Sequence, residues 1–133
     1  MRIINIHSTG KNQMINISSQ VENLIPEGIK DAVCHIFCLH TTAGLTINEN
    51  ADPDVKHDII MALEAIVPTV GREYKHAEGN SSAHIKSSLF GVSLAVPVVN
   101  GKLSLGQWQG IYFCEFDGPR SRQVHVQFTA ELK

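Results

Sequence analysis

The sequence predicts a single α+β domain over residues 1–133, in which a mostly antiparallel β-sheet or sandwich carries two or three helices packed outside. Three observations support this fold class. A chain of 133 residues fits one domain and can bury roughly two-thirds of the surface that it exposes when unfolded. Most apolar residues alternate with polar ones, which is typical of strands with one covered face. The stretches with helical spacing are short and are bounded by capping residues, proline or glycine.

The first third of the chain predicts a hairpin, a short helix and a central strand. Residues 4–6 and 15–17 alternate between apolar and polar side chains around a turn at 8–12, so we expect these two strands to pair. Ser18 or Ser19 is a suitable cap for a short helix. Residues 32–40 are apolar on both faces, which favours a central strand that is covered on both sides.

The rest of the chain predicts a long helix, a second helix and further strands. Residues 45–47 indicate a short strand. The long helix has Asp52 as its N-cap and Pro68 as its stop. A second, shorter helix is expected from about Ser82 to Phe90. Three more strands are expected at residues 92–99, 110–116 and 122–131.

Several classes of protein are excluded by composition. The net charge is −2 and no run of lysine and arginine occurs, so we expect no nucleic-acid partner. No apolar stretch approaches about 20 residues, so we expect no membrane partner. The N-terminus does not resemble a signal peptide, which favours a cytoplasmic location. Glycine-rich phosphate loops, the Gly-x-Ser-x-Gly elbow and Cys-x-x-Cys are all absent, and the three cysteines are expected to be buried thiols.

Histidine is the first candidate for chemistry, because seven occur in 133 residues. His40, His76 and His84 lie where strands or helices are expected to meet loops. Three neutral imidazoles with an open fourth position are ligands typical of a catalytic zinc or a related divalent metal. Their spacing matches no local zinc motif, so three ordinary polar histidines are the alternative.

Two further clusters combine carboxylate, amide and aromatic groups. Glu49 is a candidate general base or metal ligand, and Asn48 a candidate for holding a substrate oxygen. A turn that leads into the helix cap is the alternative. Trp108 offers a flat apolar surface beside the amide of Gln109, which suits a planar ring. A hairpin turn with tryptophan on its rim is the alternative there.

The last cluster is a tight turn followed by two arginines. Gly118 and Pro119 set the turn, and Arg120 beside it can form two hydrogen bonds with a phosphate or carboxylate. A surface salt bridge is the alternative, and it is the interpretation that we expect for Arg122. Asn80, between the second and third candidate histidines, is a further candidate for substrate binding.

Four motifs in one order resemble the YjbQ-like family of small bacterial and archaeal proteins, often labelled secondary thiamine-phosphate synthases. The resemblance extends over essentially the whole chain. It departs from the family at Gln107, where threonine usually precedes the tryptophan. The matching stretches are His40–Glu49, Tyr74–His76 with Asn80–Lys86, Gly106–Gln109 and Asp117–Arg120.

The resemblance implies a homotrimer with a metal or anion site. The family's clustered histidines match His40, His76 and His84, its acidic residue matches Glu49, and its arginine matches Arg120. The implied cofactor is a divalent metal, with zinc expected and magnesium or manganese as alternatives. The implied reaction joins a pyrimidine pyrophosphate to a thiazole phosphate, so the partner is a small phosphorylated heterocyclic substrate.

That reaction assigns physical roles to the candidates. A divalent metal or Arg120 would neutralise the leaving pyrophosphate, with His40, His84 and Glu49 as the other catalytic candidates. Trp108 would stack on a heteroaromatic ring, and the amide of Gln109 would bond the ring edge. Two other functions remain open: a metal-dependent hydrolase of a phosphorylated metabolite, and a non-catalytic trimeric protein that binds a metabolite.

Overall fold

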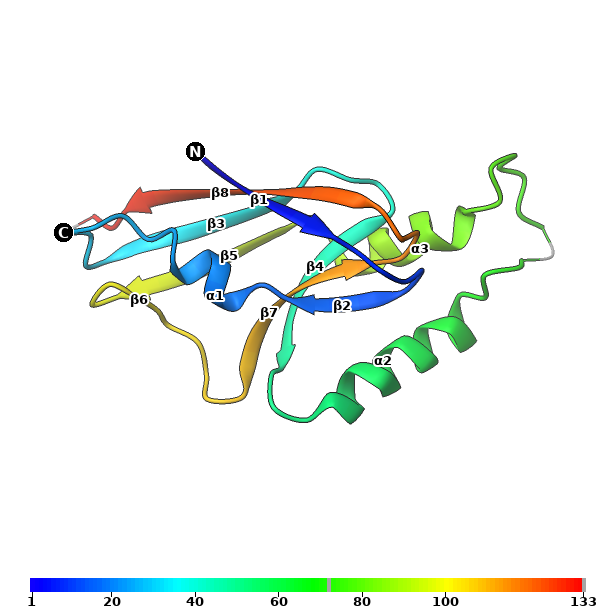
Figure 1. Cartoon of the computed structure of the whole chain (residues 1–133), viewed down its shortest axis with the longest axis horizontal. Coiled ribbons are helices and arrows are strands. Elements are labelled where there is room, and N and C mark those ends of the chain that lie inside the picture. The colour runs from blue at the N-terminus through cyan, green and yellow to red at the C-terminus, as the bar shows by residue number, and fades with distance from the viewer. Residues whose placement is uncertain (72, 133) are drawn as a thin grey trace.

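Two antiparallel sheets form the centre of the computed structural model, which describes residues 1–71 and 73–132 (Figure 1). Five strands form sheet A in the order β1 (Arg2–His7), β8 (Ser121–Ala130), β3 (Ala32–Cys38), β5 (Ser93–Val99) and β6 (Lys102–Leu103). Three strands form sheet B in the order β2 (Gln13–Asn16), β7 (Gln109–Glu115) and β4 (Ala43–Glu49). The α+β class with largely antiparallel strands is therefore confirmed.

The main core lies between the two sheets. Ile36 of β3 and Val124 of β8 face it from sheet A, and Leu45 of β4 and Phe113 of β7 face it from sheet B. A second apolar cluster, which includes Tyr112, lies on the other face of sheet B. Because sheet B is covered on both faces, every residue of β7 after its first is buried.

Three helices are formed by the described residues: α1 (Ser18–Glu22), α2 (Pro53–Ile66) and α3 (Ser81–Phe90). The two longer ones match the sequence prediction. Asp52 caps α2 by accepting a hydrogen bond from the backbone N–H of Asp54 at 2.9 Å. Gly91, with φ at 90°, ends α3 in a backbone conformation that favours glycine. Within the described chain, no helix has the length and apolarity needed to cross a membrane.

The helices α2 and α3 cover the outer face of sheet B. Ile59, Ile60 and Leu63 of α2 pack against the cluster that contains Tyr112. Phe90 at the end of α3 packs there too, in a T-shaped arrangement with the ring of Phe116. The layers are thus sheet A, the main core, sheet B, the second cluster and the helices. The outer face of sheet A carries no helix among the described residues.

The hairpin expected between residues 4–6 and 15–17 is wrong. β1 pairs with β8, and β2 pairs with β7, so the two strands belong to different sheets. The segment at 8–12 crosses from one sheet to the other instead of closing a turn. Alternation fixes which face of a strand is buried but not which strand lies beside it, and several strands in this chain share the same pattern.

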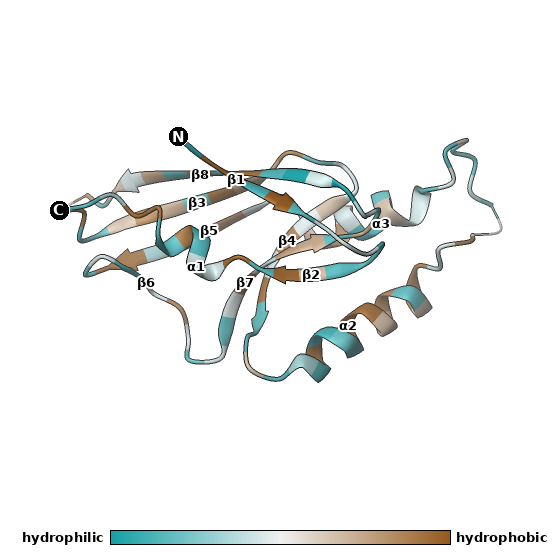
Figure 2. Cartoon of the chain, in the orientation of Figure 1, coloured by the Kyte–Doolittle hydropathy of each residue, from teal (hydrophilic) through white to brown (hydrophobic). Residues whose placement is uncertain are grey.

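The strand expected at 32–40 is shorter and less covered than predicted. β3 ends at Cys38, and its side chains alternate between buried and more exposed. Phe37 is 47% exposed and Leu39, just beyond the strand, is 42% exposed. Figure 2 shows hydrophobic residues along β1, β3 and β5, all strands of sheet A. The apolar outer side chains of β3 therefore face outward in the single chain.

Candidate functional site

A cleft of about 410 Å³ lies where the segment after β3, the N-terminal half of α3 and the turn before β8 meet. The end of β3 and the start of β8 lie side by side, because these two strands of sheet A pair antiparallel, with Cys38 opposite Val124. Arg122 lines the cleft as well. The structure brings five of the predicted site residues together in this lining: His40, His76, Asn80, His84 and Arg120.

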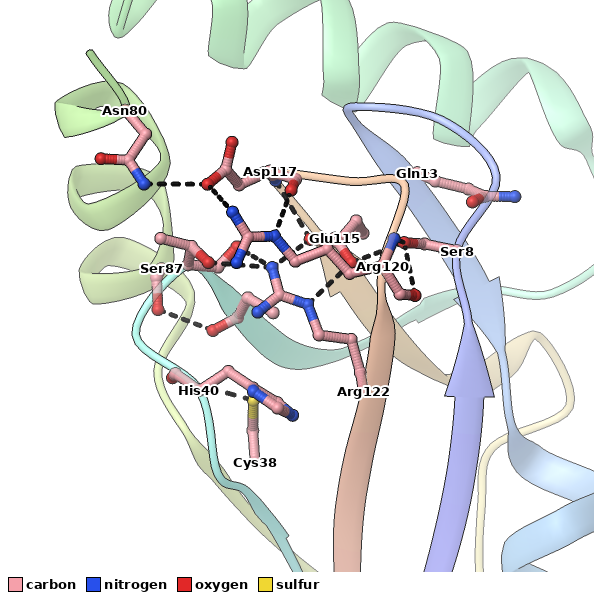
Figure 3. Close-up of polar contacts among 12 residues, drawn as sticks. Ser8, Gln13, Cys38, His40, Asn80, Ser87, Glu115, Asp117, Arg120 and Arg122 are labelled. Atoms are coloured by element: carbon pink, nitrogen blue, oxygen red, sulfur yellow. Dashed lines mark hydrogen bonds and ion pairs between the residues drawn. The ribbon is translucent and has the colours of Figure 1, made fainter. Parts of the chain in front are cut away.

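Arg122 and Glu115 form a buried ion pair beneath the cleft (Figure 3). Their side chains are 4% and 0% exposed. The Nε of Arg122 donates to Oε1 of Glu115 at 2.8 Å, and Nη2 donates to Oε2 of Glu115 and, at 2.8 Å, to Oγ1 of Thr42. Nη1 has no hydrogen-bond partner among the described residues. Among these residues, the unpaired side-chain atoms that are closed off from solvent do not include Nη1. We infer that Nη1 reaches the surface of the cleft.

Further hydrogen bonds hold the Glu115 carboxylate in its ionised form. Ser8 Oγ donates to Oε1 at 2.7 Å, and the backbone N–H of Asp117 donates to Oε2 at 3.0 Å. Burial alone would raise the pKa of Glu115, but the hydrogen bonds from Arg122, Ser8 and Asp117 outweigh burial and place this pKa below its ordinary value. Both members of the pair are therefore charged at neutral pH.

The expectation that Arg122 forms a surface salt bridge is wrong. Arg122 lies at the same parity in β8 as Val124 and Val126, which are buried in the main core. The two-residue alternation of strand side chains is visible in the sequence and would have placed Arg122 on the inner face of β8. Glu115 likewise lies within an apolar strand, where a lone carboxylate requires a cationic partner.

Arg120 stands at the rim of the cleft, where its side chain is half exposed. Its Nε donates to the backbone oxygen of Asp117, and its Nη2 donates to Oδ2 of Asp117, each at 2.8 Å. The same Oδ2 accepts a hydrogen bond from Nδ2 of Asn80 at 2.8 Å. Asp117 thus links the turn before β8 to the first residue before α3, and it fixes both neighbours at the cleft.

The three histidines reach the cleft from different elements. His40 follows β3, His76 lies in the segment before α3, and His84 lies on α3. The rings of His76 and His84 lie edge to face, with centroids 5.4 Å apart. Nε2 of His40 accepts a hydrogen bond from the backbone N–H of Gln123 at 2.9 Å. Burial and the nearby Arg122 guanidinium lower the pKa of His40, so its ring is neutral at pH 7.

This arrangement does not fit a metal centre with three imidazole ligands. No group of three or more histidine, cysteine, aspartate or glutamate side chains among the described residues is placed to hold one ion. The Nε2 lone pair of His40 is already engaged by Gln123, which leaves His76 and His84 as the adjacent imidazoles. The divalent metal therefore stays a prediction.

The other four candidates form a second cluster at the opposite end of sheet B. Asn48 and Glu49 end β4, and Glu49 pairs with Gln109 at the start of β7. The seven residues of β4 span about 20 Å at the usual rise of a strand. Trp108 is 58% exposed beside this end. The motif at residues 40–49, interpreted as one site in the sequence, is thus divided between two ends of a strand.

Local hydrogen bonds in the second cluster support its turn interpretation. Oε2 of Glu49 accepts from the backbone N–H of Ala51 at 2.9 Å, which stabilises the turn before α2. Oε1 of Gln109 accepts from the backbone N–H of Gly106 at 2.8 Å. The indole of Trp108 remains open to contact with a flat ring.

Comparison with known proteins gives consistent matches over nearly the whole chain. A family model described as UPF0047 protein YjbQ-like matches residues 2–131. The protein YugU of Bacillus subtilis is 48% identical over 96% of this chain and 97% of its own. MJ1081 of Methanocaldococcus jannaschii is 46% identical over 95% of this chain and 91% of its own.

Solved structures show the same fold. An uncharacterised conserved protein from Clostridium acetobutylicum is 51% identical, covers 96% of this chain and 99% of its own, and superposes with a TM-score of 0.93. The conserved hypothetical protein TT1486 from Thermus thermophilus is 38% identical over 96% of this chain and 98% of its own, with a TM-score of 0.89. These matches are strong enough to fix the family and the fold together.

Proposed function

The chain belongs to the YjbQ-like UPF0047 family, and we propose that its cleft binds the phosphoryl group of a small phosphorylated metabolite in an enzymatic reaction. The observation that carries this proposal is the buried Arg122, whose Nε and Nη2 are held by Glu115 and Thr42 while Nη1 is left for the cleft. A guanidinium fixed in this way presents charge-assisted donors without having to reorganise when an oxyanion binds.

Two other features of the cleft suit an anion. Arg120 stands at its rim, with one terminal nitrogen engaged by Asp117 and the other available. The ten-residue helix α3 begins beside Asn80, whose side chain does not cap it, so the positive end of the helix dipole also lies at the cleft. Donors from β8, from the turn before it and from the start of α3 therefore line one cleft, which the carboxylate of Glu78 also lines.

The reaction that the sequence resemblance implies, formation of thiamine phosphate from a pyrimidine pyrophosphate and a thiazole phosphate, would use this arrangement as follows. Arg120 and Arg122 would stabilise the negative charge on the leaving pyrophosphate. His84 and His76 stand beside them as groups able to move a proton. A hydrolase of a phosphorylated metabolite would use the same residues with water as the nucleophile.

We further propose a homotrimer, since the single chain leaves the second cluster far from the cleft. The outer face of sheet A exposes Phe37 and Val99, and Leu39 lies between that face and the cleft. A second copy that covers this face would bury those side chains next to the site. Glu49 and Trp108 of one copy could then complete the cleft of another.

Anion binding is tested by titrating the protein with inorganic phosphate and with pyrophosphate in a calorimeter. We expect saturable binding at one anion per chain. Arg122→Lys and Arg120→Gln should each weaken binding about tenfold or more, because each removes charged hydrogen bonds. Arg2→Lys, at the far edge of sheet A over the Phe128 ring, should bind like the wild type. Wild-type protein that binds neither anion would refute the proposal.

Catalysis needs a separate assay. Thiazole phosphate and pyrimidine pyrophosphate are supplied together, and thiamine phosphate is measured by its conversion to a fluorescent product. Elemental analysis of untagged protein, beside a His76→Ala/His84→Ala variant, tests the predicted metal. Tight binding of phosphate without turnover of these substrates would favour the hydrolase or the non-catalytic binding protein.

A further inference from the structure

We infer that His40 is a fixed hydrogen-bond donor that presents Nδ1–H to the bound oxyanion, with its tautomer set by the backbone of β8. This inference deepens the proposed function and rests on it. The observation that carries it is the hydrogen bond from the N–H of Gln123 to Nε2 of His40, at 2.9 Å.

The direction of that hydrogen bond leaves no choice of tautomer. A backbone N–H can only donate, so Nε2 of His40 must offer its lone pair and carries no proton. The neutral ring then carries its proton on Nδ1. Rotating the ring by half a turn would place a carbon against the Gln123 N–H and leave this donor without an acceptor, so the hydrogen bond also fixes the orientation of the ring.

One neighbouring side chain packs against the ring, and a second contact involves the backbone of the same residue. The rings of His40 and Phe113 pack in a T-shaped arrangement, with centroids 6.4 Å apart and planes at 86°. The backbone oxygen of His40 lies 4.0 Å from Sγ of Cys38, a weak contact that accompanies the end of β3. The imidazole is therefore set before any ligand arrives.

The protonated nitrogen remains available to a ligand. Nδ1 of His40 has no hydrogen-bond partner among the described side chains and backbone groups. Among the described residues, the unpaired side-chain atoms that are closed off from solvent do not include this nitrogen. His40, Arg120 and Arg122 all line the cleft, and Figure 3 shows His40, on the segment that follows β3, beside the Arg122 side chain of β8.

The consequence is that these three side chains offer donors and no free lone pair. Guanidinium groups have no acceptor, and the only lone pair of the neutral His40 ring is used by Gln123. Such a set is complementary to phosphoryl oxygens and not to a cation. A metal ion that used Nε2 of His40 would have to break the bond to β8 and leave the Gln123 N–H unpaired.

Nuclear magnetic resonance of protein labelled with ¹⁵N-histidine tests the inference. We expect the His40 ring, assigned by its loss in His40→Asn, to show a protonated Nδ1 and an unprotonated Nε2 in the free protein. Inorganic phosphate should shift the Nδ1 signal, and zinc alone should leave both His40 signals unchanged. A protonated Nε2, or a zinc-dependent change at Nε2, would overturn the inference.

Two variants give a second readout in the phosphate titration. The amide nitrogen of asparagine occupies about the place of Nδ1, and that of glutamine about the place of Nε2. His40→Asn should retain phosphate affinity within about threefold, and His40→Gln should lose about tenfold, the loss of one hydrogen bond to a charged group. The reverse order would overturn the inference. Failure of the wild type to bind phosphate would instead refute the proposed function.

Discussion

Replacing Glu115 with glutamine tests how the cleft is built. The substitution keeps the shape of the side chain but removes its charge, so Arg122 becomes a buried cation, 4% exposed, without a counter-ion. Breaking a buried pair from one side costs about 3–5 kcal/mol, because the remaining charge has lost both water and its partner. That is a large part of the total stability of a typical domain, which is about 5–15 kcal/mol.

Urea unfolding at pH 7, followed by circular dichroism, measures this loss, and a thermal scan should show a melting temperature lower by about 10 °C or more. The matched control is Asp58→Asn, which breaks the pair between Asp58 and His57 on the exposed side of α2 and should leave stability nearly unchanged. A double variant, Glu115→Leu with Arg122→Met, removes both charges and should recover part of the loss, because the Asp117 N–H and Thr42 Oγ1 still lack their partners. If Glu115→Gln is as stable as Asp58→Asn, the ion pair between Glu115 and Arg122 does not stabilise the fold around the cleft.

Three further predictions concern the rest of the fold. A hydrogen bond from the backbone of Thr69 helps lower the pKa of Glu64 to about 2. The ionised Glu64 carboxylate therefore stabilises the fold above pH 4.5, and this stabilisation is lost as pH falls toward 2. Glu64→Gln should flatten the dependence of the free energy of unfolding on pH, measured with urea, between pH 4.5 and 2. Gly44→Ala places a Cβ 2.8 Å from the backbone oxygen that follows α3 and should lower the melting temperature, whereas Gly10→Ala, with its nearest atom at 3.9 Å, should not. Phe37→Asp should prevent trimer formation, as measured by light scattering, without unfolding the chain.

Local patterns predicted the local structure of this chain well. The cap at Asp52, the stop after α3 and the alternation of β8 each depend on residues that are near one another in sequence. The hairpin failed because pairing is not local: β1 finds its partner more than a hundred residues away in β8. A period of two sets the buried face of a strand, and the partner is chosen by the assembled sheet.

The same distinction explains the site. His40, His84 and Arg120 were predicted together. The pairing of β3 with β8 brings His40 and Arg120 to one cleft, and α3 adds His84. Arg122 was assigned to a surface salt bridge, although it lies on the same face of β8 as core residues. The carboxylate that makes its burial possible, Glu115, lies on another strand, so no motif in the sequence connects the two residues.

The division of the candidates between two ends of sheet B constrains the mechanism. A strand of seven residues keeps Glu49 about 20 Å from the residues that precede β4, and a ligand with one phosphoryl group and one ring is shorter than that span. Within one chain, Glu49 and Trp108 therefore cannot contact a ligand whose phosphoryl group is held by Arg122. If light scattering gives the mass of a monomer at micromolar concentration, the chemistry must use the cleft residues alone, and Glu49 serves the turn before α2. If it gives a trimer, the Trp108→Ala variant decides the matter: weaker binding of a phosphorylated heterocycle with unchanged binding of inorganic phosphate would place the tryptophan of a second copy against the ring.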